Sequence, residues 1–237
     1  MKIIIFSDVH GNQYAFRQFI EEIHKIEYDK IIFCGDIYGY YYGQSEIIEI
    51  MKRMKNLYAV RGNHDQIAID IFEGKKSKEE YVKKYGHSYD KLKREDISFV
   101  KSLPDRNNIL IDEKKCVIIH GTLDDVLCGR LYPKDTIKRQ ELYEKYDIIF
   151  CGHTHFQMVR KYKNFEIVNA GSLGQQRDGK GFCYVFIDSE KKIVEYRTIK
   201  WKLSLLEKEI KIKDPDNKKM IEILHRGEHE KNISDCN

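Results

Sequence analysis

Two histidines stand one residue apart after an apolar run, in the stretch Ile148–Ile149–Phe150–Cys151–Gly152–His153–Thr154–His155. Four other short apolar runs lead into side chains of a similar kind, so imidazole, carboxylate and amide groups recur at strand-like ends. The residues concerned are Asp8, His10, Asp36, Asn63, His120, His153 and His155. This mixture of nitrogen and oxygen donors suits divalent transition metals. The sequence therefore predicts a metal centre assembled from distant segments.

The number and spacing of these donors favour two ions. Residues i and i+2 of an extended segment point to the same face, about 7 Å apart at Cα; Asp8 with His10 and His153 with His155 are such pairs. Seven donors exceed what one ion needs, but they suffice for two ions that share a bridging carboxylate at a separation of roughly 3.5–4 Å. We expect Mn, Fe, Ni, Co or Zn, because Mg prefers to keep water and carboxylate oxygens.

The donors need a scaffold that brings strand ends together. Short apolar runs rich in β-branched residues predict buried strands. Between the first of these strands, apolar residues recur at the spacing of a helix. These strands are expected at Lys2–Phe6, Lys30–Phe33, Leu57–Val60, Cys116–Ile119 and Asp147–Phe150. Strand–helix alternation is typical of α/β layering, in which ligands bind at the carboxyl ends of the strands.

The pattern changes after Gly152, where strand-like segments follow one another at hairpin spacing and predict antiparallel pairing. They are Gln157–Tyr162, Phe165–Asn169, Phe182–Asp188 and Lys191–Thr198. We therefore expect an α/β fold, a two-sheet α/β sandwich of mixed sheets flanked by helices. A lysine- and tyrosine-rich segment at about 66–108 predicts a small helical cap insertion. The main domain would span 1–200, and 201–237 would form a C-terminal helix and a polar tail.

The composition and charge of the chain narrow the kinds of function that it can have. The net charge is +4 on many charges of both signs, so it gives little support for nucleic-acid binding. No apolar run approaches the roughly 18 residues of a membrane span, and the initial apolar run is too short for a signal peptide. The six cysteines show no CxxC or framework spacing. We expect a cytoplasmic protein, and the sequence leaves a homo-oligomer open.

The motifs DxH, GD, GNHD, a later HG and GHTH occur in that order between Asp8 and about Arg177. Each motif alone is weak, but the ordered set at strand ends resembles the calcineurin-like metallophosphoesterase superfamily. Within it, GDIYGYY and NAGSLGQQRDG resemble the small bacterial and archaeal phosphodiesterases.

This resemblance assigns the donors to two ions. Asp8, His10, Asp36 and His155 would hold one, and Asp36, Asn63, His120 and His153 the other. The resemblance also implies that His64 faces the phosphate as proton donor or charge stabiliser, oriented by Asp65. The implied reaction is dinuclear-metal-dependent hydrolysis of a phosphoester, most simply a phosphodiester, by attack of a metal-bridging hydroxide on phosphorus.

The substrate side of the site leaves alternatives open. Tyr38 and Tyr40 form either an aromatic lip for a base or aryl group or part of the loop packing. Ser172 lies in a loop that family members bring against the site, although a plain hairpin turn fits the same residues. Arg177 is a phosphate clamp or a surface charge. The family usually carries a small aliphatic residue at the position of Tyr38, so its substrate preference does not transfer.

Several functions share these motifs. A small phosphoester, with a nucleotide-like molecule as one candidate, is the expected substrate. The alternatives are a phosphomonoesterase or protein Ser/Thr phosphatase, a nuclease, and a non-catalytic scaffold. A nuclease would need a basic groove that diffuse lysines do not supply, and a scaffold would tolerate the loss of donors that are all present here.

Overall fold

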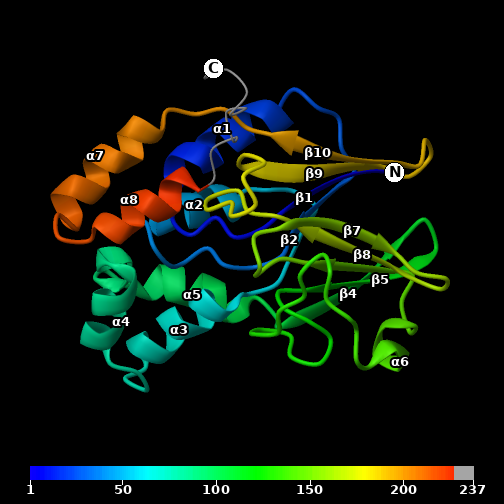
Figure 1. The fold of residues 1–237 in the computed structure, drawn as a ribbon, viewed down its shortest axis with the longest axis horizontal. Coiled ribbons are helices and arrows are strands. Elements are labelled where there is room, and N and C mark those ends of the chain that lie inside the picture. The colour runs from blue at the N-terminus through cyan, green and yellow to red at the C-terminus, as the bar shows by residue number, and fades with distance from the viewer. Residues whose placement is uncertain (227–237) are drawn as a thin grey trace, which may run out of the picture.

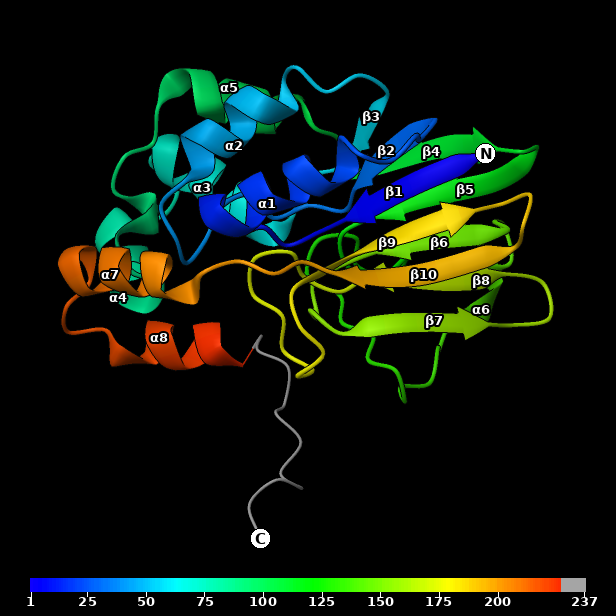
Figure 2. The same ribbon diagram turned by 90° about the horizontal axis from the view of Figure 1, so that it is seen from above.

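A computed structural model describes residues 1–226 as two five-stranded sheets that pack face to face (Figure 2). One sheet has the order β10-β9-β1-β2-β3. Its strands are β1 Lys2–Phe6, β2 Lys30–Phe33, β3 Leu57–Ala59, β9 Cys183–Asp188 and β10 Ile193–Thr198. The other has the order β4-β5-β6-β8-β7. Its strands are β4 Arg106–Ile111, β5 Lys114–Ile119, β6 Ile148–Cys151, β7 Gln157–Lys161 and β8 Glu166–Ala170.

The position of strand β1 between two hydrophobic cores explains why its run of apolar residues is unbroken. Ile3 and Ile5 belong to the core between the sheets, whereas Ile4 and Phe6 belong to the core beneath the helices. Successive side chains of a strand point to opposite faces, so a strand covered on both sides must be apolar throughout. Burial of each such side chain contributes about 1.5–3 kcal/mol.

Both sheets are mixed, which confirms the predicted two-sheet sandwich. Strands β1, β2 and β3 are parallel, and β9 adds antiparallel to β1. The hairpins β7–β8 and β9–β10 are antiparallel as expected. However, β8 also pairs in parallel with β6, so the second half is not wholly antiparallel. The helical stretch predicted up to residue 108 ends earlier, because β4 begins at Arg106.

Helices cover the first sheet and gather at one end of the sandwich (Figures 1 and 2). Those nearest the sheet are α1 Gln13–Ile23, α2 Gln44–Met51, α3 Asn63–Phe72 and α5 Arg94–Ser102. Between α3 and α5 lie α4 Lys78–Tyr85 and the 3₁₀ turn η1 His87–Tyr89. We call residues 78–89 the cap. A short helix, α6 Gln140–Tyr143, lies beside the second sheet.

The C-terminal segment forms two helices rather than the single predicted one, α7 Leu203–Lys213 and α8 Lys218–His225. Asp214, between them, is tied to the cap: its carboxylate accepts hydrogen bonds from the His87 backbone N–H at 3.0 Å and pairs with His87 Nδ1 at 2.6 Å. It also accepts from the Tyr42 hydroxyl at 2.5 Å. The predicted polar tail lies outside the described residues, and the boundary at residue 200 stays a prediction.

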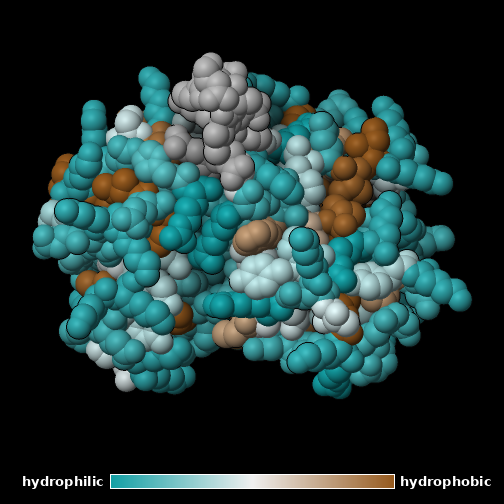
Figure 3. All heavy atoms as spheres, in the orientation of Figure 1, coloured by the Kyte–Doolittle hydropathy of each residue, from teal (hydrophilic) through white to brown (hydrophobic). Residues whose placement is uncertain are grey.

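The molecular surface in Figure 3 is hydrophilic over most of the visible face, and its apolar side chains occur in small separate groups. Within residues 1–226, no helix has the length and apolar character needed to span a bilayer.

Candidate metal centre

The loops that follow β1, β2, β3, β5 and β6 bring all seven predicted donors together, although they are spread from residue 8 to residue 155. Their elements come from both sheets. Six of the seven donors are buried, and Asp8, His10 and His120 have no exposed surface, whereas Asn63 is half-buried. The sandwich therefore supplies an enclosed cluster of nitrogen and oxygen donors at one end.

The first group of donors surrounds one carboxylate oxygen. Asp8 Oδ1 lies 3.1 Å from His155 Nε2 and 3.7 Å from His10 Nε2. The Nε2 atoms of His10 and His155 are 3.0 Å apart. All three atoms lie close enough to one another to hold a single ion.

The second group surrounds His120. Its Nε2 atom lies 3.2 Å from Asp36 Oδ2, 3.1 Å from Asn63 Oδ1 and 3.2 Å from His153 Nδ1. Asp36 Oδ2 is also 3.7 Å from His10 Nε2 in the first group. Asp36 therefore stands between the two groups, as a bridging ligand would.

Backbone carbonyls orient three of the four histidines. The Nδ1 atoms of His10, His120 and His155 lie 2.8, 2.7 and 2.5 Å from the carbonyl oxygens of Tyr38, Cys34 and Gln175. A carbonyl accepts only, so each Nδ1 carries the proton and, in the neutral ring, Nε2 presents its lone pair to the cluster.

This donor arrangement fits a cation. The facing Nε2 atoms of His10 and His155 are both lone-pair atoms in neutral rings, so they cannot hydrogen-bond to each other. Asp8 Oδ1 is buried and has no hydrogen-bond partner. Buried polar atoms are costly without a partner, and a divalent ion would satisfy this set.

The electrostatics favour the forms that bind metals. Burial would raise the pKa of Asp8 and Asp36, but neighbouring histidines, chiefly His155 and His120 respectively, hold both below the ordinary range. Burial lowers the pKa of His153 to about 4. Carboxylates stay ionised and this imidazole stays neutral, as ligands must be. His120 is the exception: burial opposes its charge, but Asp36 prevails and raises its pKa to about 9.

The backbone at five of the seven donors is left-handed, not extended. The φ angles are 53° at Asp8, 49° at His10, 68° at Asp36, 66° at His153 and 60° at His155. The predicted alternation of an extended segment is therefore wrong here, since β1 ends at Phe6 and β6 at Cys151. Positive φ costs a non-glycine residue about 1–3 kcal/mol and is concentrated at functional sites. The chain turns sharply at these five donors, whereas Asn63 begins helix α3 and His120 directly follows β5.

His64 lies against the cluster, with its ring centroid 5.0 Å from that of His10. The prediction that Asp65 orients it is wrong. Asp65 is the third residue of α3, and its carboxylate turns back to accept hydrogen bonds from four backbone N–H groups, at Gly62, Asp36, Ile37 and Tyr38. The atom near His64 Nδ1 is instead the Tyr89 hydroxyl oxygen, at 2.7 Å. Asp65 shapes the loop after β2.

The structure places two of the predicted substrate-binding residues, Tyr38 and Ser172, in the interior. Tyr38 is only 1% exposed, and its ring stacks near that of Tyr89 with centroids 6.4 Å apart. Because Asp65 draws the backbone of this loop inward, Tyr38 joins the core instead of a lip. Ser172 is fully buried, and its hydroxyl donates to the Asp8 carbonyl oxygen at 2.7 Å. It supports a donor and does not reach a substrate.

Tyr40 and Arg177 do lie beside the cluster. The Tyr40 ring centroid is 5.0 Å from that of His10, and the Tyr40 hydroxyl is 3.4 Å from Arg177 Nη2. Neither sequence motif nor spacing pointed to Arg130, whose Nε lies 3.3 Å from His153 Nε2. Tyr89 was missed as well, because only the tyrosine-rich character of the cap hinted at it. These side chains add cationic and aromatic groups around the donors.

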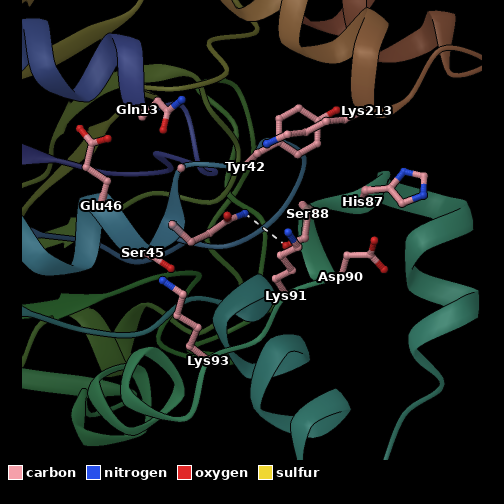
Figure 4. Close-up of a pocket in the computed structure, with 12 residues that line it drawn as sticks. Gln13, Tyr42, Ser45, Glu46, His87, Ser88, Asp90, Lys91, Lys93 and Lys213 are labelled. Atoms are coloured by element: carbon pink, nitrogen blue, oxygen red, sulfur yellow. Dashed lines mark hydrogen bonds between the residues drawn. The ribbon is translucent and has the colours of Figure 1, made fainter.

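A separate cavity of about 520 Å³ is lined mainly by residues of the segments 42–46 and 87–93 (Figure 4). Tyr42, Ser88, Lys91, Lys93 and Lys213 are among its lining residues. None of the predicted site residues lines it, so this cavity is distinct from the donor cluster.

A model of the calcineurin-like phosphoesterase superfamily domain matches residues 1–192. Together with this match, the fold and the donor cluster define a metal-dependent phosphoesterase. The chain belongs to the calcineurin-like phosphoesterase superfamily.

Individual proteins also resemble this chain in sequence or in fold. The uncharacterized protein MJ0912 of Methanocaldococcus jannaschii is 29% identical over 229 residues, which cover 82% of this chain and 87% of that protein. Among solved structures, a metallophosphoesterase from Sphaerobacter thermophilus has a TM-score of 0.78 at 22% identity, covering 96% of this chain and 99% of its own. The hypothetical protein PH1004 from Pyrococcus horikoshii OT3 has a TM-score of 0.81 at 17% identity, with the same coverage. The solved structures support the fold.

Proposed function

We propose that this phosphoesterase is a phosphodiesterase that uses two divalent ions, drawn from Mn, Fe, Ni, Co and Zn. The observation that carries the proposal is the position of Asp36, with Oδ2 3.2 Å from His120 Nε2 and 3.7 Å from His10 Nε2. One carboxylate thus serves both groups of donors. Two bound ions would activate a water molecule and neutralise charge on the phosphoryl oxygens.

The remaining residues would handle the substrate and the leaving group. His64 lies beside both His10 and Asp36, where it can donate a proton or a hydrogen bond to the departing oxygen. Arg177 can pair with a phosphoryl oxygen, and Tyr40, adjacent to it, offers an aromatic face to the ester group. The burial of six of the seven donors limits the competition of bulk water with these contacts.

The preference for a diester rests on the sequence resemblance of the loops at 35–41 and 169–179, which contain Tyr40 and Arg177. The substrate would be a small phosphoester, with a nucleotide-like molecule among the candidates. The proposed cytoplasmic location rests on the cysteine pattern.

A comparison of kcat/KM for bis(p-nitrophenyl) phosphate and p-nitrophenyl phosphate tests the diester preference. The metal-loaded protein should favour the diester. Dominance of the monoester would instead support the phosphomonoesterase or protein phosphatase alternative, and no turnover of either ester by protein that holds two ions would contradict the catalytic proposal.

A further inference from the structure

We propose that Tyr89, a cap residue, orients the imidazole of His64 and is therefore a positioning residue of the active site; this inference rests on the proposed role of His64. The Tyr89 hydroxyl oxygen is 2.7 Å from His64 Nδ1. His64 and Tyr89 are both buried, so water does not compete for this contact. This hydrogen bond occupies Nδ1, so Nε2 is the ring nitrogen that can contact a substrate.

Two residues beside His64, Asp65 and Gly39, do not take over this task. Asp65 directs its carboxylate at four backbone N–H groups. Gly39, on the loop after β2, has no side chain, and a Cβ added there would lie 2.6 Å from His64 Nδ1 and 3.0 Å from His10 Nδ1. The φ angle of 99° at Gly39 further disfavours any side chain. The loop thus keeps the space beside Nδ1 clear, and the cap fills it.

Packing fixes the position of Tyr89. Its ring lies nearly parallel to that of Tyr38, at an interplanar angle of 12°, and meets the rings of Tyr81 and Tyr85 at 6.2 and 6.3 Å. The neighbouring residues of η1 are tied down from two sides. Asp214 accepts from the His87 backbone N–H, and the Ser88 carbonyl accepts from Gln44 Nε2 at 3.4 Å.

A hydroxyl group suits this role because it both donates and accepts. When both ring nitrogens of His64 are protonated, the Tyr89 oxygen accepts from Nδ1–H, and it still does so after the proton on Nε2 has left. In a neutral ring that carries its proton on Nε2, the hydroxyl donates to Nδ1 instead. The cap thereby contributes to the geometry of catalysis as well as covering the site.

The first test is kinetic. Tyr89→Phe retains the stacked ring and removes the one hydrogen bond, so kcat for an alkyl diester should fall about tenfold, the size expected for one hydrogen bond, with little change in KM or metal content. The loss should be smaller for a nitrophenyl diester, because that leaving group needs less help. Tyr81→Phe is the matched control: it removes a hydroxyl from the same aromatic cluster and should leave kcat unchanged.

A double-mutant cycle separates this inference from the proposed function. In a His64→Ala background, Tyr89→Phe should cause no further loss, because its partner is gone. Additive losses would overturn the positioning role while leaving the role of His64 intact. If His64→Ala alone left kcat unchanged in a protein with both ions, the proposed role of His64 would fail first.

An NMR measurement avoids any dependence on turnover. In metal-free protein labelled with ¹⁵N-histidine, the imidazole ¹⁵N shifts of His64 should indicate one fixed tautomer and should change in Tyr89→Phe but not in Tyr81→Phe. Unchanged shifts for His64 in folded Tyr89→Phe protein, checked by its melting temperature, would overturn the inference.

Discussion

The backbone N–H of His153 donates a hydrogen bond to Asp8 Oδ2 at 3.0 Å, across 145 residues of sequence. Asp8 follows β1 of one sheet, and His153 follows β6 of the other. The two oxygens of Asp8 therefore have different tasks: Oδ2 joins the loops of the two sheets, and Oδ1 faces the histidine nitrogens. The same carboxylate that would bind an ion also aligns the two halves of the fold.

Asp36→Asn should lose both ions, because it removes the charge shared by the two groups of donors and replaces one carboxylate oxygen by an amide NH₂. Metal analysis after gel filtration should give two ions per chain for the unchanged protein and well below one for the variant. Asp105→Asn, which alters a surface carboxylate paired with Arg61, is the control and should keep two. Retention of one full equivalent in Asp36→Asn would argue against a shared ligand.

His64→Ala should keep both ions and the fold but lower kcat by about 10²–10⁴, the range expected for a general acid. His64 also lies close enough to His10 and Asp36 to hold an ion with them, but each of the two proposed ions already has four ligands without His64. The loss should shrink for nitrophenyl esters, whose leaving group is already acidic. Steady-state kinetics with alkyl and nitrophenyl diesters, beside metal analysis, check this; loss of metal would reassign His64 to the ligand set.

Ser172→Ala should lower stability and leave KM unchanged. The buried hydroxyl donates to the Asp8 carbonyl and accepts from the Gln175 backbone N–H at 2.7 Å, so its removal should cost about 1–3 kcal/mol. Urea denaturation measures the loss. Ser102→Ala, at an exposed helix end, should change stability by no more than about 0.5 kcal/mol. A raised KM without a stability change would restore the substrate-binding role first expected for Ser172.

The metal-free protein should lose stability as pH rises through about 9. Burial works against the charge on His120, but Asp36 raises its pKa from 6.5 to about 9 in the folded state. A raised folded pKa gives a stabilisation that is fully present below about 6.5 and disappears above about 9, of order 3 kcal/mol. Chemical unfolding of chelator-treated protein at pH 6 and pH 9.5 measures it.

His120→Asn is the comparison for this pH effect, since it keeps a polar side chain that does not titrate. Its stability should vary less over the same interval than that of the unchanged protein. An equal decline in both proteins would attribute the pH dependence to other groups. The same proton must leave before Nε2 can bind an ion, so apparent metal affinity should rise with pH in this interval.

The sequence allowed the scaffold and the donor set to be predicted because two signals were strong. Apolar runs such as Lys2–Phe6 must be buried on both faces, and motif order placed donors such as Asp36 and His153 at the ends of such runs. Strand β4 was missed because it begins with Arg106, Asn107 and Asn108, polar residues at the edge of a sheet. Edge strands need little apolar character, so periodicity is weak there.

The details of the site depended on backbone turns that a residue pattern does not encode. Tyr38 and Tyr40 look equivalent in the sequence, yet the first is buried and the second lies beside His10, since Asp65 pulls the loop inward at Tyr38 and the chain turns with φ 62° at Tyr40. The partner of His64 came from the cap, 25 residues away. Only tertiary packing brings that tyrosine to the ring.

The carboxylate of Asp214 holds the hydroxyl of Tyr42 and the turn at His87 together. It is remote in sequence from every predicted donor, and it lies between two surface helices. In a mutational survey scored by growth or turnover, residue 214 should nevertheless behave like the active site, because it anchors His87, and Tyr89 ends the same 3₁₀ turn. Tolerance to substitution at a residue would then depend on its contacts with the cap and not on its distance in sequence from the predicted donors.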